Sequence, residues 1–391
     1  MTSRQLNTLW SYHDAQWRHP GQITSQWQDA VAVDERLLRH SVRGAWWETL
    51  ESNDITLLVT REYEHLVMAM SVGERGPSMT YMAMPHPSGL AVDRKRGVVH
   101  LASTRNPNQV FAMAPVTGPT PGDRPLVPLE SRFYPGSLRF HDLAMIGDEL
   151  HANAVGRNAV VRLGGSGRFE PAWWPRCIES ATGPIFSQNH IQLNSIAAGS
   201  TLETSYFSAS SDQVSHRRPG QRNFPVDGRG VIFSGATREP MVRGLTRPHS
   251  ARLHRGRVWV DNSGYGEVVM GRDGAFEPIA RLPGWTRGLC FKGSIAFVGT
   301  SRVIPRFRQY APGLDPARAQ CGLHAVDTRT GRVVGSLIWP LGNQVFSVDW
   351  VERSWSSGLP FPVGRKRVSE RQRLLFYGFS TEPARNTRNG S

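Results

Sequence analysis

The sequence has few cysteines and no long apolar run. The three cysteines, Cys177, Cys290 and Cys321, lie far apart, which excludes a disulfide framework and a Cys-x-x-Cys zinc site. No segment approaches the roughly 18 to 20 apolar residues that span a bilayer. The first residues lack the basic and apolar regions of a signal peptide. We therefore expect a cytoplasmic protein with no membrane partner.

Common catalytic signatures are absent as well. The sequence contains no Gly-x-Ser-x-Gly nucleophile motif, no Gly-Lys-Ser/Thr phosphate loop and no His-Glu-x-x-His zinc motif. An active site in this chain would have to be assembled from residues that are distant in the sequence.

Lysine is scarce. Only Lys95, Lys292 and Lys366 are lysines, so the 46 basic residues are nearly all arginines, and they exceed the 32 acidic residues to give a net charge of +14. Arginine forms forked hydrogen bonds to carboxylate and phosphate, which favours an anionic ligand. A GC-rich genome that writes arginine in place of lysine explains the same bias. Because the arginines are scattered and no nucleic-acid motif is present, we expect no nucleic-acid partner.

What the chain has in abundance is glycine and proline, with 39 and 27 residues among 391, which is typical of an all-β fold with many turns. A polar residue followed by a short apolar strand recurs about every 50 residues, the period of a propeller blade. These six strand starts are Ser88–Asp93, His141–Ala144, Asn194–Ala197, His249–Arg252, Thr286–Cys290 and Phe346–Trp350.

Each of the first five starts is followed by a turn and a second apolar strand, but the sixth is not. Strands at the other end of the chain, from Asp54 to Thr60 onward, lack an inner partner. We therefore predict a six-bladed β-propeller over residues 51–385, closed by residues 345–351 joining the blade begun at residue 54. Seven blades are the alternative, if residues 364–380 form further strands. Two long insertions, 210–229 and 301–320, follow second strands.

The two ends of the chain differ from the repeats. Leucines and tryptophans in residues 1–50 recur at roughly helical spacing, which predicts two or three short amphipathic helices as an N-terminal extension. They are expected to cap the propeller, and a homodimer contact through them is the alternative. Residues 386–391 are expected to be a disordered tail.

Inner-strand starts and the loops after second strands lie on the same face of a propeller, so their side chains are expected to converge on one central funnel. Nearly all of them are polar, which is unexpected for a packed core. Arg287 follows one strand start, and the loops supply the other candidate contacts to an anionic or peptide-like substrate. These candidates are Arg61, Arg105, Asn106, Asn158, Asp212, Asn262, Arg287 and Arg302, with Glu62 or Tyr265 to move a proton.

Three funnel residues could hold a divalent ion. His141 and His249 begin inner strands two blades apart, and Asn194 begins the strand between them. Imidazole and amide ligands with open positions would suit a metal that activates water or a carbonyl. Two interpretations without metal stay open, a channel filled with ordered water and a histidine that acts as a general base.

The aligned repeats resemble a family of conserved hypothetical bacterial proteins of unknown function. The stretches that carry the resemblance are Pro87–Asp93, His141–Ala144, Leu193–Ala197, Pro248–Ser250 with Trp259–Gly264, and Leu282–Gly288. Gly89-Leu90-Ala91-Val92-Asp93 is also similar, more distantly, to the strand motif of gluconolactonase-like six-bladed propellers. That resemblance implies a divalent ion held by Glu, Asn and Asp. Here His141 and His249 replace the pattern, so a transition metal is expected instead of calcium.

Two functions are compatible with these residues. The first is a metal-dependent enzyme, a hydrolase, lyase or oxidoreductase, that acts on a small anionic or peptide-like ligand in the funnel. The second is a propeller without catalytic activity that binds a peptide or glycan at the same mouth. The histidines favour the first function, and the lack of an unambiguous nucleophile favours the second.

Overall fold

The computed structural model describes residues 2, 4–5, 33–104, 108–116, 124–165, 167–221, 223–272 and 274–364. Most of the regular structure in this part of the chain is strand, arranged in six antiparallel sheets of four or five strands. From the inner to the outer strand, blade 1 contains β27 (Ser347–Glu352), β2 (Ile55–Arg61), β3 (Leu66–Gly73), β4 (Gly76–Ala83) and β28 (Phe361–Pro362), and blade 2 contains β5 (Pro87–Asp93), β6 (Val98–Ser103), β7 (Asn108–Pro115) and β8 (Leu126–Tyr134). Blade 3 contains β9 (Phe140–Ile146), β10 (Glu149–Ala154), β11 (Ala159–Leu163) and β12 (Phe169–Trp173), and blade 4 contains β15 (Leu193–Ala197), β16 (Tyr206–Ala209), β17 (Gly230–Ser234) and β18 (Pro240–Leu245). Blade 5 contains β19 (Pro248–His254), β20 (Arg257–Asn262), β21 (Glu267–Arg272) and β22 (Ala275–Arg281), and blade 6 contains β23 (Trp285–Lys292), β24 (Ile295–Ser301), β25 (Cys321–Asp327), β26 (Val333–Trp339) and β1 (Ser41–Gly44).

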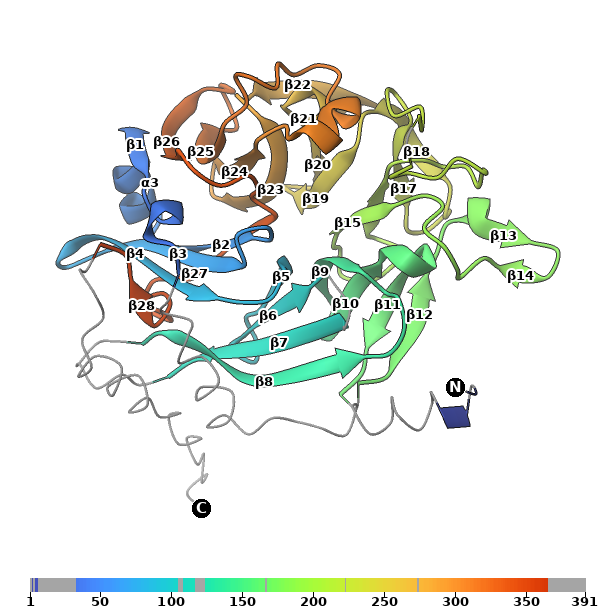
Figure 1. Ribbon diagram of the computed structural model, residues 1–391, viewed down its shortest axis with the longest axis horizontal. Coiled ribbons are helices and arrows are strands. Elements are labelled where there is room, and N and C mark those ends of the chain that lie inside the picture. The colour runs from blue at the N-terminus through green and yellow to red at the C-terminus, as the bar shows by residue number, and fades with distance from the viewer. Residues whose placement is uncertain are drawn as a thin grey trace.

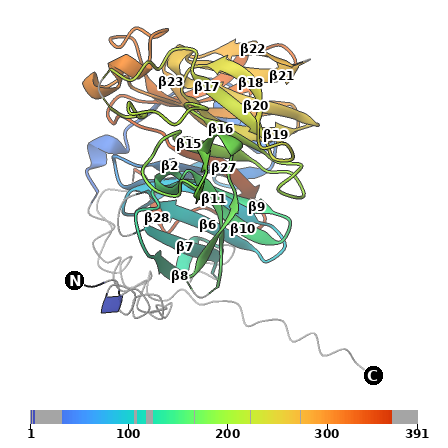
Figure 2. The ribbon, with the colours of Figure 1, turned by 90° about the vertical axis from the view of Figure 1, so that its right-hand side faces the viewer.

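The innermost strands of successive blades contact one another in a closed ring, from β5 through β9, β15, β19, β23 and β27 back to β5. Figure 1 looks along the axis of this ring and shows the six sheets around it. Figure 2 shows the molecule from the side, with blades 2 and 3 below blades 5 and 6. The protein is therefore a six-bladed β-propeller, as the repeats predicted.

Apolar side chains fill the spaces between neighbouring blades. Trp173 of blade 3, for example, stacks on Phe207 of blade 4 with ring centroids 4.0 Å apart. A strand inside such a wheel is covered on both faces, and all seven residues of β2 are buried. This explains why the inner and second strands read as continuous apolar runs in the sequence.

The inner strands approach one another very closely at the hub. A Cβ atom on Gly89 would lie 2.6 Å from the backbone nitrogen of Leu143 in the next blade, and one on Gly288 would lie 2.7 Å from the Val348 side chain. Both glycines are in β-bulges, where two residues of the inner strand oppose one residue of its neighbour. Only glycine allows this approach, so the hub is tightly closed around its axis.

Blade 1 contains strands from both ends of the chain. β27 pairs with β2 in antiparallel register from Ile55 opposite Glu352 to Thr60 opposite Ser347. The expected closure placed these same segments together. The ring therefore has no unpaired inner strand.

The chain before blade 1 contains a strand as well as helix. Helix α3 (Trp46–Ser52) buries Trp46 and Leu50, but Ser41–Gly44 form β1, which extends the outer edge of blade 6 by pairing with β26. The segment expected to be helical thus contains helix α3, and β1 was not predicted, because the edge of β26 offers backbone groups to a short segment.

Three expectations lie outside the described residues: helices before residue 33, strands within 365–380 and the tail 386–391. A dimer contact through the N-terminal helices falls there too. In the described part of the chain, the structure has no helix both long and apolar enough to cross a membrane.

Candidate functional site

The polar ring at the hub is largely a set of hydrogen bonds between neighbouring blades. Short side chains at the inner and second strands form hydrogen bonds to the backbone of the next blade, which satisfies groups that would otherwise be buried without partners. These bonds are Thr60 Oγ1 to Ser88 O at 2.8 Å, Ser88 Oγ to Phe140 O at 2.9 Å, Ile196 N to Asp142 Oδ2 at 3.0 Å, Asn194 Nδ2 to Pro248 O at 2.9 Å, Gly288 N to Ser250 Oγ at 2.7 Å, and Ser301 Oγ to Val345 O at 3.1 Å. Polarity at these positions therefore has a structural cause.

One ion pair crosses the hub. Arg252 of blade 5 donates from Nη1 to Oδ2 of Asp142 in blade 3 at 2.7 Å, and from Nη2 to Oδ1 at 3.2 Å. The two blades are not neighbours, so the ion pair passes along the inner strand of blade 4, which lies between them in the ring. Asp349 of blade 1 also faces this pair, because its charge acts on Arg252. We call the Arg252–Asp142 pair the floor of the site.

Above the floor, a β-bulge pushes Arg287 into the hub. Arg287 and Gly288 together oppose Gly299 of β24, where a Cβ atom would lie 2.2 Å from the Arg287 carbonyl oxygen. The guanidinium lies over the ring of Phe346, 3.4 Å from its centroid. Arg287 is only 5% exposed, and burial lowers its pKa to about 10.

A second buried arginine lies at the same mouth. Arg247, just before β19, is 4% exposed, and its guanidinium lies over Tyr310 at 4.4 Å and donates to Gln192 Oε1 at 2.6 Å. Burial lowers the pKa of Arg247 to about 10, and the charge of Arg287 acts in the same direction. The two cations are therefore close enough to repel each other.

His249 lies between these cations and has a defined tautomer. Its Nδ1 is 2.9 Å from the carbonyl oxygen of Arg247, so Nδ1 carries the proton and Nε2 keeps a lone pair. Burial and the charges of Arg287 and Arg247 hold the pKa of His249 well below its usual value. His141 also acts on His249 electrostatically, and its ring packs edge-on against Phe346 at 5.5 Å.

A polar relay connects Arg287 to the rim. The Gln344 amide satisfies both neighbours when its oxygen accepts from Arg287 Nη1 at 2.7 Å and its nitrogen donates to Glu62 Oε2 at 2.9 Å. The other Glu62 oxygen is 3.8 Å from Nδ1 of His86, which is partly exposed. Glu62 is thus part of the mouth, as the sequence led us to expect, but it reaches Arg287 through an amide.

The predicted metal residues come to the same end of the hub without forming an equivalent ring. His141 is inside the bulge of β9, opposite Asn153, whereas His249 precedes the bulge of β19 and is paired with Asp261. The amide nitrogen of Asn194 donates hydrogen bonds to Pro248 O and Ser210 Oγ, and its buried Oδ1 has no hydrogen-bond partner. Among the described residues, no three His, Cys, Asp or Glu side chains form a metal-binding group.

Several residues predicted to contact a ligand instead form hydrogen bonds that stabilise the protein itself. Arg61 is fully buried and donates to Leu37 O and Leu341 O. Asn158 organises the loop at residues 185–191 with both ends of its amide. Asn262 accepts from Thr246 N and donates to Glu267. The hydrogen bonds of these three side chains therefore serve mainly to hold neighbouring segments in place, although Nε of Arg61 has no hydrogen-bond partner.

The remaining predicted residues lie at the edge of the mouth or beyond it. Asp212 pairs with Arg243 at 2.8 Å, Tyr265 donates to Asp227 at 3.0 Å, and Arg302 donates to Pro340 O at 2.7 Å. Tyr265 thus fastens two loops together, and we do not assign it a catalytic role. Arg105 and Asn106 lie outside the described residues.

Sequence reasoning missed Arg247 and Gln344, and it named Phe346 only as the start of an inner strand. It considered inner-strand starts and the loops after second strands, whereas Arg247 and Gln344 belong to the segments that lead into inner strands. Arg247 directly precedes the Pro248-His249 motif, which could have drawn attention to it.

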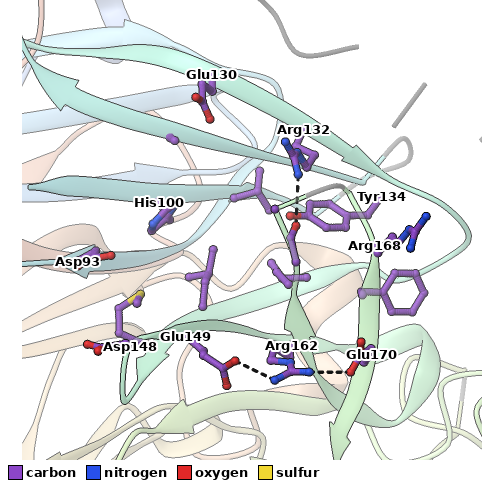
Figure 3. A pocket seen from close by; sticks show the side chains of 18 of the residues that line it. Asp93, His100, Glu130, Arg132, Tyr134, Asp148, Glu149, Arg162, Arg168 and Glu170 are labelled. Carbon is purple, nitrogen blue, oxygen red and sulfur yellow. Dashed lines mark hydrogen bonds and ion pairs between the residues drawn. The ribbon is translucent and has the colours of Figure 1, made fainter. Parts of the chain in front are cut away.

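A separate hollow of about 530 Å³ lies between blades 2 and 3, away from the hub. Figure 3 shows its charged lining, in which Arg162 joins Glu149 and Glu170, each at 2.8 Å. Arg96 pairs with Asp93 at 2.7 Å in the same groove. Because these charges largely neutralise one another, the groove is a weaker candidate than the hub.

Comparison with solved structures supports the fold. One chain of a nidogen–laminin complex superposes with a TM-score of 0.50 at 8% identity, covering 76% of this chain and 98% of that one. A gluconolactonase from Xanthomonas campestris gives 0.45 at 12% identity, covering 74% and 86%. At 8% identity the first likeness bears on architecture alone. No curated protein matches the sequence. The profile of one family, described as a domain of unknown function (DUF4915), matches residues 44–357.

Proposed function

The chain belongs to the family with the domain of unknown function DUF4915, and we propose that its hub binds a small anion between Arg247 and Arg287. One observation supports this above all others: two arginines, only 4% and 5% exposed, share one mouth, and neither forms an ion pair within the described part of the chain. The charges of Glu62, Asp142 and Asp261 act on Arg287 without an ion pair to it, and burying a cation without a paired counter-charge is costly. A carboxylate, sulfate or phosphate group would offset that cost and accept forked hydrogen bonds.

The same geometry suits hydrolysis of that anion's ester, lactone or amide bond. His249 presents a neutral imidazole whose Nε2 lone pair can take a proton from water. The water oxygen would bond to the acyl carbon as its proton passes to Nε2. The bond from that carbon to the leaving oxygen or nitrogen would then break as the same proton passes to the leaving atom. Arg287 would stabilise the negative charge that develops on the carbonyl oxygen. In this proposal Glu62 and Gln344 orient Arg287, and His141 and Phe346 form the wall.

Metal binding by His141, His249 and Asn194 is the second candidate. The unpartnered Oδ1 of Asn194 favours it, since a buried carbonyl oxygen without a hydrogen bond can ligate a cation. Against it, Arg247 and Arg287 would repel a divalent ion in the same mouth. The residues therefore fit an anion better than a cation, and we derive no step through a metal.

Titration calorimetry with sulfate tests the anion site, because sulfate does not itself titrate near neutral pH. We expect saturable binding to the wild type and at least a tenfold loss in Arg287→Met, which keeps an apolar side chain over Phe346. Arg243→Met, at an exposed ion pair, is the matched control and should bind as the wild type does. Equal binding by all three proteins would refute the proposal.

Chelation separates the two candidates. After exhaustive treatment with EDTA, elemental analysis of untagged protein and a repeated sulfate titration should show an unchanged affinity. A stoichiometric metal that disappears in His249→Ala, together with sulfate binding that requires it, would favour the metal-dependent enzyme instead.

A further inference from the structure

The insertion after β24, residues 301–320, extends over the mouth as a fixed roof. It contains the short 3₁₀ helix η6 (Pro305–Tyr310). Backbone hydrogen bonds tie it to its surroundings: Arg302 N to Asn343 O at 2.8 Å, Gly313 N to Gly264 O at 3.0 Å, and Gln320 N to Pro283 O at 2.7 Å. We call this insertion the roof segment.

Aromatic side chains of the roof segment pack against both blade 6 and blade 1. Phe307 packs against Trp285 at the start of β23, with ring centroids 4.8 Å apart. On its other side it stacks on Tyr63, in the turn after β2, at 6.3 Å and an interplanar angle of 13°. Arg306 lies over the same Tyr63 ring and donates to its hydroxyl. Tyr63 directly follows Glu62, so this contact lies at the rim of the anion site.

The other end of the roof segment reaches blades 4 and 5. Tyr310 is the aromatic surface beneath the Arg247 guanidinium, and it forms an apolar cluster with Phe224 and Val226 of the other long insertion. The roof segment therefore contacts the mouth from blade 4 through blades 5 and 6 to blade 1. Its Tyr310 lies against the Arg247 guanidinium, and the charge of Asp142 in the floor acts on Arg287.

We propose that the roof segment restricts this site to small, non-polymeric anions. This inference rests on the proposed anion site, and it names the class of ligand. A peptide or glycan chain must run past its binding site in both directions. The floor blocks passage through the hub, and the contact between Phe307 and Tyr63 blocks passage across the rim. A single small acid satisfies Arg247 and Arg287 without either path.

The experiment compares sulfate with a heparin-derived hexasaccharide, which carries the same sulfate chemistry on a polymer. Calorimetry is done near physiological ionic strength, because the positively charged surface binds polyanions nonspecifically at low salt. For each ligand, binding at the hub is measured as the affinity that is lost when Arg287 is replaced by methionine. In the wild type we expect this loss for sulfate and not for the hexasaccharide.

Two variants loosen the roof segment without touching the arginines of the site. They are Arg306→Ala with Phe307→Ala, and Tyr63→Ala, which removes their partner on blade 1. In both variants, sulfate affinity should stay within about threefold of the wild type. The hexasaccharide should bind about tenfold more tightly than it binds the wild type, and adding Arg287→Met should abolish this increase. Tyr63→Phe keeps the ring that stacks on Phe307 and is the matched control, so it should exclude the hexasaccharide. Unfolding midpoints identify which variants are folded.

Each outcome decides one of the two proposals. Arg287-dependent binding of the hexasaccharide to the wild type would overturn the roof as a size filter and leave the anion site intact. The size filter would also be overturned if folded variants kept sulfate binding and gained no hexasaccharide binding. Sulfate binding that does not depend on Arg287 would overturn the anion site itself.

Discussion

Arg252 and Asp142 form a two-pronged ion pair between blades 5 and 3, which are not neighbours in the ring, with side chains only 19% and 6% exposed. Asp142 also accepts the backbone N–H of Ile196 at 3.0 Å. The pair therefore joins blades 5 and 3 at the hub, and Asp142 also holds the inner strand of blade 4.

Removing one partner of this pair should be strongly destabilising. Arg252→Met leaves a buried carboxylate without its cation, so we expect a loss of about 3–5 kcal/mol in the free energy of unfolding. Urea unfolding at neutral pH measures it. Arg162→Met breaks ion pairs that are about half exposed and should cost no more than about 1 kcal/mol. Equal losses in the two variants would show that the floor is not a structural element.

Closure of the ring gives a second prediction. A chain that ends before Gln344 lacks β27, which leaves β2 without its inner neighbour and opens the ring of inner strands. We expect circular dichroism and tryptophan fluorescence to show no cooperative unfolding transition. A chain that ends after Ser357 loses β28, a two-residue strand at the outer edge of blade 1, and the hydrogen bonds of Gly358 and Leu359 to Leu126 and Thr80. Its ring of inner strands stays closed, so it should keep a cooperative transition. Cooperative unfolding of the shorter chain at the wild-type midpoint would contradict a closed ring.

The fold was predictable because each blade repeats one pattern. A propeller strand is buried on both faces, so it leaves a largely apolar run that follows a glycine turn, as Val98–Ser103 does after Gly97 and Arg257–Asn262 after Gly256. Six such repeats reinforce one another even where a single repeat is ambiguous. β1 was missed because Ser41–Gly44 owe their extended conformation to the edge of β26, a partner almost 300 residues later that local sequence does not reveal.

The site was harder to predict, because polarity at the hub has two causes that look alike in a sequence. Ser88 and Asn194 are polar in order to bond to the next blade, whereas Arg287 is polar and turned into the hub by a bulge. Only the register of each bulge separates them. Arg247 lies in the connection between blades 4 and 5, and the repeat pattern of the strands makes no prediction for such connections.

The stability of the protein at mildly acidic pH should depend on His324 in blade 6. This side chain is 2% exposed, bonded to Thr300 through Nε2 at 3.0 Å and to Ser336 through Nδ1 at 2.9 Å. Burial lowers the pKa of His324 to about 4. The unfolded chain, with an ordinary pKa near 6.5, then binds more protons than the folded protein between these values, so stability falls as the pH falls.

Between pH 7 and pH 5 this one group should cost about 2 kcal/mol in the free energy of unfolding. Urea unfolding at the two pH values, repeated for His324→Gln, isolates the contribution as a difference of differences. The variant is less stable at pH 7 and should lose less on acidification. A pH dependence that is the same in both proteins would show that His324 is not held neutral.

Sulfate binding should be accompanied by proton uptake at His249. Arg247 and Arg287 disfavour the imidazolium, His141 adds to that effect, and Asp261 is the residue paired with His249 across the sheet. An anion placed between the two guanidinium groups offsets their charge, so it should raise the pKa of His249. The complex then holds more protons than the free protein, and sulfate affinity should increase as the pH falls through the raised pKa.

Calorimetry at about pH 6, in two buffers with different ionisation enthalpies, measures this uptake directly, because sulfate itself takes up no proton there. We expect a fractional uptake in the wild type that disappears in His249→Gln, while His324→Gln, far out in blade 6, keeps it. If sulfate binds through Arg287 but the same uptake persists without His249, another group is responsible. The imidazole then does not sense the anion, and the proposed role of His249 as a base that gains strength when the substrate binds is wrong.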